Sequence, residues 1–270
     1  MSVTDASVAL FVSPHLDDVA FSCSGTLAKW SRWGGRVVVA TVFTRSVPNP
    51  TGFALACQLD KGLSQDVDYL ALRRAEDEEF GRELGVARLN WIDLPEAPHR
   101  GYDSAPALFA GVRPEDRVAE EVRAKLDALV AELNPAWIFG PQAVGNHADH
   151  RQVVRALLGR PAWRARIAWY RDLPYAARFP DAPAAPELPG DLVEVAAPLG
   201  PSDLAAKFAG SARYTSQIPF QFGDGAGIAR VLGDFARLEG TRLGHPGPAE
   251  AFRVDPAAVP AWNAGVRGSG

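Results

Sequence analysis

Short apolar runs alternate with longer amphipathic stretches over residues 8–170. An apolar run bounded by turn residues is typical of a buried strand, and apolar residues recurring every three or four positions are typical of a helix. The runs predict strands at Val8–Val12, Val37–Phe43, Leu89–Leu94, Ala136–Gly140 and Ile167–Tyr170. The periodic stretches predict helices at Asp18–Trp33, Asp66–Leu84, Pro114–Leu133 and from about His147 to Leu158.

This alternation predicts the fold class. A strand, a helix and a strand in succession form a βαβ unit, whose two strands are parallel and whose crossover is right-handed. Repeated units of this kind favour an α/β fold: a Rossmann-like doubly wound, mostly parallel sheet with helices on both faces. The stretches at 49–65 and 95–111 lack periodicity and are expected to be irregular, and the proline-rich Phe179–Gly190 is expected to be a surface loop.

The C-terminal third carries fewer signals. It predicts strands at Leu192–Ala196 and near Ala251–Val254, and helices at Ser202–Thr215 and Ile228–Leu238. This stretch is short for a second hydrophobic core. We therefore expect one domain over residues 1–270, with a Rossmann-like core at 1–175 and a C-terminal extension at 176–270.

Composition and charge exclude several classes of protein. A chain that is 47% hydrophobic and 22% charged is not disordered along its length, and a net charge of −4 does not indicate a nucleic-acid or anionic-membrane partner. No apolar run reaches the roughly 18 residues of a membrane span, and Met1–Ser7 lacks the basic start of a secretory signal. Two cysteines are too few for a disulfide framework. We expect a cytoplasmic protein, and the sequence leaves its oligomeric state open, including a homo-oligomer.

A histidine and two carboxylates follow the first predicted strand, in Pro14–Asp18 (PHLDD). The carboxyl ends of parallel strands form the ligand crevice of an open α/β sheet. Imidazole and carboxylate together are a normal zinc-binding pair, so His15 and Asp18 are candidate metal ligands. The same residues would also suit a loop histidine followed by an aspartate helix cap.

A second polar cluster, Gly145–His150 (GNHADH), follows the strand Ala136–Gly140. His147 and His150 are three residues apart, so they share a helix face. A polar helix start would explain this cluster as well. The two clusters follow strands on the same edge of one sheet, and together they hold three of the five histidines. A shared metal site at this edge is therefore expected.

The paired motifs resemble those of the PIG-L/LmbE-like family of zinc-dependent N-acetylglucosaminyl deacetylases, which carry Pro-His-Pro-Asp-Asp and His-x-Asp-His after corresponding strands. Leu16 replaces the usual proline, and Val19 replaces a frequent glutamate. Further segments are similar to family elements: Ser24-Gly25, Arg73–Glu76 (RRAE), Leu84-Gly85, Tyr214–Gln217 (YTSQ) and Glu250–Phe252 (EAF).

The resemblance implies a mechanism of amide hydrolysis by metal-activated water. It implies His15, Asp18 and His150 as ligands of Zn²⁺, with one coordination position left open for water. The same set of ligands would accept Fe²⁺ or Co²⁺. Asp17 is implied as the general base that takes the proton of the water.

The second cluster would serve the substrate carbonyl. The resemblance implies that His147 stabilises the developing oxyanion as an imidazolium, and that Asp149 holds its ring and favours that charged form. The residues alone do not decide whether His147 or His150 binds the metal; only the family pattern favours His150. The substrate implied is an N-acetylglucosamine-type amino sugar or a small-molecule conjugate of it.

Four further residues are candidate substrate contacts: Arg73, Glu96, Arg100 and Gln217. Arg73 lies on a helix between two strands, Glu96 and Arg100 lie in the irregular stretch after a strand, and Gln217 belongs to the C-terminal extension. The alternative is a non-catalytic sugar-binding or cofactor-binding Rossmann-like protein. The first predicted helix does not open with Gly-x-Gly-x-x-Gly, which disfavours a dinucleotide site.

Overall fold

The computed structural model describes residues 7–265, and its centre is a sheet of seven strands in the order β3-β2-β1-β4-β5-β7-β6. The strands are β1 (Val8–Ser13), β2 (Arg36–Phe43), β3 (Arg88–Leu94), β4 (Trp137–Pro141), β5 (Ile167–Tyr170), β6 (Val193–Pro198) and β7 (Ala249–Val254). The pairs β1–β2, β1–β4, β2–β3 and β4–β5 are parallel, and β7 runs antiparallel to β5 and β6. The predicted α/β, mostly parallel sheet is confirmed.

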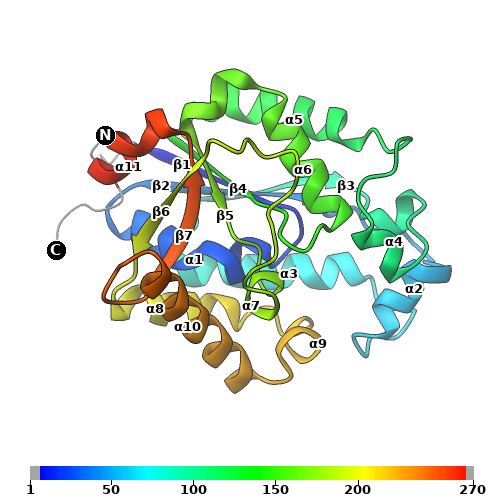
Figure 1. Ribbon diagram of the computed structural model, residues 1–270. Coiled ribbons are helices and arrows are strands. Elements are labelled where there is room, and N and C mark those ends of the chain that lie inside the picture. Colours follow the sequence, from blue (N-terminus) through cyan, green and yellow to red (C-terminus); the bar gives the residue numbers. More distant parts are fainter. Residues whose placement is uncertain (1–6, 266–270) are drawn as a thin grey trace.

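Helices cover both faces of the sheet (Figure 1). One layer holds α1 (Asp18–Arg32), α3 (Tyr69–Leu84), α8 (Pro201–Ser211) and α10 (Gly225–Arg242), and the other holds α5 (Val118–Leu133) and α6 (Ala148–Leu158). Successive side chains of a strand point to opposite faces. Phe11 of β1 accordingly packs in the core under α1, whereas its neighbour Leu10 packs in the core under α5.

The chain after residue 176 completes this sheet. Strand β7 inserts between β5 and β6, and its Phe252 is fully buried against Phe139 of β4. The last helix, α11 (Val259–Gly265), buries Trp262 against the same two rings. The extension therefore shares its hydrophobic core with the first five strands.

Four short helices lie where the sequence predicts irregular chain or no element. They are α2 (Gly52–Leu59), α4 (Ala105–Phe109), α7 (Tyr175–Arg178) and α9 (Ile218–Phe222), together with 3₁₀ turns at Ala97–Arg100, Pro161–Arg166 and Pro256–Ala258. Residues 53–57 of α2 are all half-buried, so this helix has no apolar stripe for a periodicity argument to detect. In Figure 1, α2 and α4 lie together beside one end of the sheet.

Two long helices begin later than predicted, because aspartates fix their starts. Asp68 caps α3 by accepting the N–H of Ala71, and Asp116 accepts the N–H of Val118 at the start of α5. The proline-rich loop also differs from expectation. Its Ala185 and Leu188 are buried, and the N–H of Ala185 bonds to the carbonyl of Gln142 at 2.8 Å.

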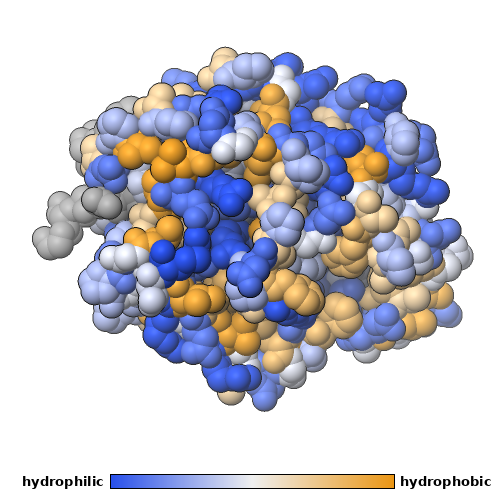
Figure 2. Space-filling model, in the orientation of Figure 1, coloured by the Kyte–Doolittle hydropathy of each residue, from blue (hydrophilic) through white to orange (hydrophobic). Residues whose placement is uncertain are grey.

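The molecular surface in the view of Figure 2 interleaves hydrophilic residues with small hydrophobic patches. Among the helices of residues 7–265, none has the length and apolar character needed to span a membrane.

Candidate active site

A cavity of about 570 Å³ lies at the carboxyl ends of the central strands. Both polar clusters contribute to its wall, together with α2, the start of α3, and the chain around α4, α7 and α9. Eight of the ten candidate site residues line it: His15, Asp17, Asp18, Arg73, Glu96, His147, Asp149 and Gln217. The other two, Arg100 and His150, lie behind this wall.

The first cluster is a tight turn between β1 and α1. The carboxylate of Asp18 accepts the N–H of His15 at 2.8 Å, and Asp18 is the first residue of α1. Between them, Asp17 has φ 152°, a backbone conformation that residues with a side chain rarely adopt. This turn places Asp17 and Asp18 on the same edge of the sheet with their carboxylates in different surroundings.

The second cluster begins at the end of β4 and continues into α6. Gly145 has φ 90°, and a Cβ there would lie 2.9 Å from the ring of Tyr175, so this turn requires a glycine. The turn brings His147 to the N-cap of α6 and His150 into its first turn. His150 is fully buried.

The two clusters meet in a set of three atoms suited to a metal ion. Ligand atoms of His15, Asp18 and His150 all lie within 4.8 Å of one another. Asp18 Oδ2 is 3.3 Å from His15 Nδ1 and 3.4 Å from His150 Nε2. His150 Nε2 is buried without a hydrogen-bond partner, although such atoms are normally paired. A divalent cation among these three atoms would satisfy it.

Each histidine of this set is held from behind by a carboxylate. His15 bonds through Nε2 to Asp149 at 2.9 Å, and His150 bonds through Nδ1 to Asp172 at 2.6 Å. This is the arrangement that orients metal-binding histidines in proteins. Asp172 was missed by the sequence analysis, although it follows β5 and so shares the strand-end position that identified both clusters.

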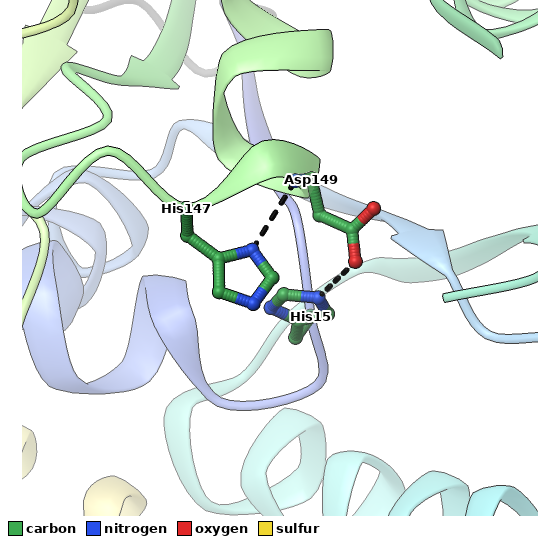
Figure 3. A group of neighbouring side chains, drawn as sticks. All are labelled: His15, His147 and Asp149. Atoms are coloured by element: carbon green, nitrogen blue, oxygen red, sulfur yellow. Dashed lines mark hydrogen bonds and ion pairs between the residues drawn. The ribbon is translucent and has the colours of Figure 1, made fainter. Parts of the chain in front are cut away.

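Asp149 contacts the two histidines in different ways (Figure 3). Its carboxylate bonds to His15 and also accepts the N–H of Ala97 at 3.0 Å, whereas its backbone N–H donates to His147 Nδ1 at 3.2 Å. Asp149 therefore contacts the His147 ring through its backbone N–H, while its carboxylate is turned toward His15. A second possible metal set, His15, His147 and Asp149, would compete with these bonds.

The surroundings of His147 disfavour the expected imidazolium. Burial, reinforced by the positive charge of His15, lowers the pKa of His147 to about 3, and the opposing effect of Asp149 is smaller. The Asp149 N–H is an additional reason for neutrality, because a nitrogen that accepts a hydrogen bond carries no proton. Both effects favour a neutral imidazole with its proton on Nε2.

The neighbouring aspartates have opposite pKa shifts. Burial raises the pKa of Asp17 to about 7, and the nearby Arg73 only partly offsets this effect. For Asp18, burial also raises the pKa, but His150 and His15 outweigh it and lower the value to about 2. Asp18 thus remains a carboxylate, whereas Asp17 exchanges a proton near neutral pH. Divergent pKa values of adjacent acids are typical of sites that perform acid–base chemistry.

The four candidate substrate contacts have different positions. Glu96 and Gln217 line the cavity, and Gln217 accepts from the hydroxyl of Tyr69 at 3.4 Å. Arg73 lines it too, but its guanidinium is engaged by Asp17 and Glu96. Arg100 differs from expectation: it pairs with Asp149 at 2.8 Å and with Asp116 at 3.0 Å, so it supports the site from outside the cavity.

Comparison with known proteins adds relatives that carry enzyme names. The PIG-L family, described as GlcNAc-PI de-N-acetylase, matches residues 10–159, more than half of the chain. A 2'-N-acetylparomamine deacetylase of Streptomyces fradiae is 37% identical over 177 residues. That match covers 63% of this chain and 58% of the relative, less than two thirds of its length.

Two solved structures are similar over nearly the whole chain. A deacetylase of an antimicrobial pseudoaglycone superposes with a TM-score of 0.77 at 26% identity, covering 93% of this chain and 97% of the other. The zinc-inhibited form of teicoplanin deacetylase has a TM-score of 0.75 at 25% identity, covering 92% and 97%. The resemblance inferred from the two motifs agrees with the fold and with these matches, and the chain belongs to the PIG-L family.

Proposed function

We propose that this protein is a metal-dependent hydrolase that removes the N-acetyl group from an N-acetylglucosamine-type amino sugar or its conjugate. The observation that carries the proposal is the meeting of His15, Asp18 and His150 at one edge of a cavity that also exposes Asp17 and His147. Metal-dependent amide hydrolysis uses three kinds of group: metal ligands, a proton acceptor, and a hydrogen-bond donor to the carbonyl oxygen. Family membership supports the same reaction.

His15, Asp18 and His150 would hold the metal. A bound divalent ion such as Zn²⁺, or Fe²⁺ or Co²⁺, would polarise the amide carbonyl and lower the pKa of a bound water. Two imidazoles and one carboxylate are a ligand set that leaves a position for water. The Asp149 and Asp172 carboxylates fix both rings, so that each presents one nitrogen toward Asp18.

Asp17 accepts the proton of the attacking water and later delivers it to the leaving amine. A general base works best when its pKa is near the operating pH, and a pKa of about 7 meets that condition. Its carboxylate lines the cavity next to Asp18, which places it beside the ligand atoms without being one of them.

His147 donates its Nε2–H to the oxygen of the amide as negative charge develops there. A neutral imidazole can polarise a carbonyl in this way, and a pKa lowered by burial keeps it neutral. The Asp149 N–H holds the donor tautomer in place. This role replaces the imidazolium that the family resemblance implies.

The cavity is large enough for a conjugate of an amino sugar. Its volume of about 570 Å³ lies within the range of about 300–1,000 Å³ for sites that bind drug-sized molecules. Glu96 and Gln217 offer an acceptor and an amide to sugar hydroxyls. The curated relative named for 2'-N-acetylparomamine makes an N-acetylated aminoglycoside precursor the first compound to try.

The experiment is acetate release from 2'-N-acetylparomamine and from N-acetylglucosamine by metal-loaded protein, with and without a chelator. We expect release that the chelator abolishes and added metal restores. The alternative, a non-catalytic sugar-binding protein, predicts binding of these compounds without acetate. Acetate release that is unaffected by complete metal removal would contradict the metal-dependent mechanism.

A further inference from the structure

Arg73 is buried at the inner wall of the cavity, with only 3% of its surface exposed. The protein engages three of its five N–H donors. Nη2 donates to the carbonyl of Leu16 at 2.6 Å and pairs with Asp17 Oδ1 at 3.0 Å, while Nη1 pairs with Glu96 Oε1 at 3.2 Å. Nε is buried and has no hydrogen-bond partner.

Asp17 depends on this side chain for its position. Among residues 7–265, Arg73 is the one cation within ion-pair distance of the Asp17 carboxylate. The Asp17 backbone has φ 152°, a strained conformation that must be held by its surroundings. Arg73 contacts this turn at two points: the carbonyl of Leu16 and the carboxylate of Asp17.

A guanidinium suits this task, and an ammonium would not. Its planar fork reaches two acceptors in fixed directions, whereas a lysine offers a single point charge. The ring of Tyr69, one helical turn earlier on α3, lies 5.3 Å from the guanidinium carbon and restricts its plane. Tyr69 and Arg73 both belong to α3, so a regular helix fixes the position of the guanidinium relative to Asp17.

We propose that Arg73 is a positioning residue that acts through Asp17 and holds the base in its reactive geometry. The inference rests on the proposed function, since it assigns Asp17 as the base. The positioning role accounts for the burial of Arg73 of α3 beside Asp17.

The test is a double-mutant cycle on acetate release with wild type, Arg73→Gln, Asp17→Asn and the double variant. Displacing a catalytic group by about 1 Å costs up to about 10²-fold, so Arg73→Gln is expected to lower kcat by about 10- to 10²-fold with KM changed less than about twofold. In the Asp17→Asn background, the same change is expected to lower kcat less than about threefold. Equal losses in both backgrounds, or a loss confined to KM, would overturn the proposal.

Arg74→Gln is the matched control on the same helix. Arg74 points away to Thr44 and Asp93, and its removal should leave kcat and KM unchanged. Should Arg73→Gln not fold, Arg73→Lys keeps the charge without the fork, and the same cycle applies. A lysine variant with wild-type kcat would contradict the need for a guanidinium.

A crystal structure of Arg73→Gln separates this inference from the proposed function. The Asp17 carboxylate is expected to move from its wild-type position, and an unmoved carboxylate would overturn the positioning role whatever the protein's activity. Absence of acetate release from wild type would instead contradict the proposed function. In that case, a displaced Asp17 carboxylate in Arg73→Gln would still support the positioning of Asp17 by Arg73.

Discussion

Replacing Glu250 by glutamine is predicted to destabilise the protein severely, although the side chains have nearly the same shape. Glu250 is 5% exposed and Lys207 is 1% exposed, and their charged atoms lie 2.6 Å apart. The carboxylate also accepts the N–H of Gly25 at 3.1 Å, and the N–H and hydroxyl of Thr26 at 2.7 and 2.6 Å. It therefore joins β7 to the helix that begins at Asp18.

The expected loss of stability follows from the charge of Lys207, which stays buried when Glu250 is replaced. Removing one partner of a buried ion pair costs about 3–5 kcal/mol, because the other charge is left uncompensated. Glutamine creates no cavity, but its NH2 group would face N–H donors at either oxygen position, so lost hydrogen bonds add to this electrostatic cost. Gly25 shows how close the approach is, since a Cβ there would lie 3.0 Å from Glu250 Oε1.

The assay is denaturant unfolding of wild type, Glu250→Gln and Asp234→Asn. Asp234 pairs with Arg237 on the exposed face of α10, and its loss should cost less than about 1 kcal/mol. The double variant Glu250→Leu with Lys207→Met should recover part of the loss, because no buried charge remains. A Glu250→Gln variant as stable as Asp234→Asn would refute the reasoning.

Four further variants test the site. Asp172→Asn should weaken metal binding about 10- to 100-fold, measured by competition with a chelator, because the carboxylate orients the His150 ring. His150→Ala should lose metal and His147→Ala should keep it; the reverse result in metal analysis would favour the second possible metal set. Glu76→Ala removes the acceptor of three hydrogen bonds from residues 215–216, so KM should rise if Gln217 contacts substrate, and an unchanged KM would exclude that contact.

Much of the architecture was predictable because it rests on local pattern. Every strand predicted in the first 170 residues is present within a residue or two, since fully buried parallel strands read as uninterrupted apolar runs. The strand-end rule also predicted that the two polar clusters would meet, because parallel strands present their carboxyl ends at one edge.

The remaining features depend on contacts that a linear pattern does not contain. Helix α2 is stabilised by tertiary packing around the cavity and lacks an amphipathic period. The side chain of Arg100 could have pointed into the cavity or behind it, and only the positions of Asp116 and Asp149 decide between them. The lowered pKa of His147 follows mainly from its burial, which the spacing of residues does not reveal.

The most direct test of the central claim measures acetate release and metal content together in wild type and Asp17→Asn. The account predicts equal metal in both proteins and a loss of turnover of about 10²- to 10⁴-fold in the variant, because the change removes a proton acceptor and no ligand. An Asp17→Asn protein that keeps its metal and turns over at the wild-type rate would contradict the account.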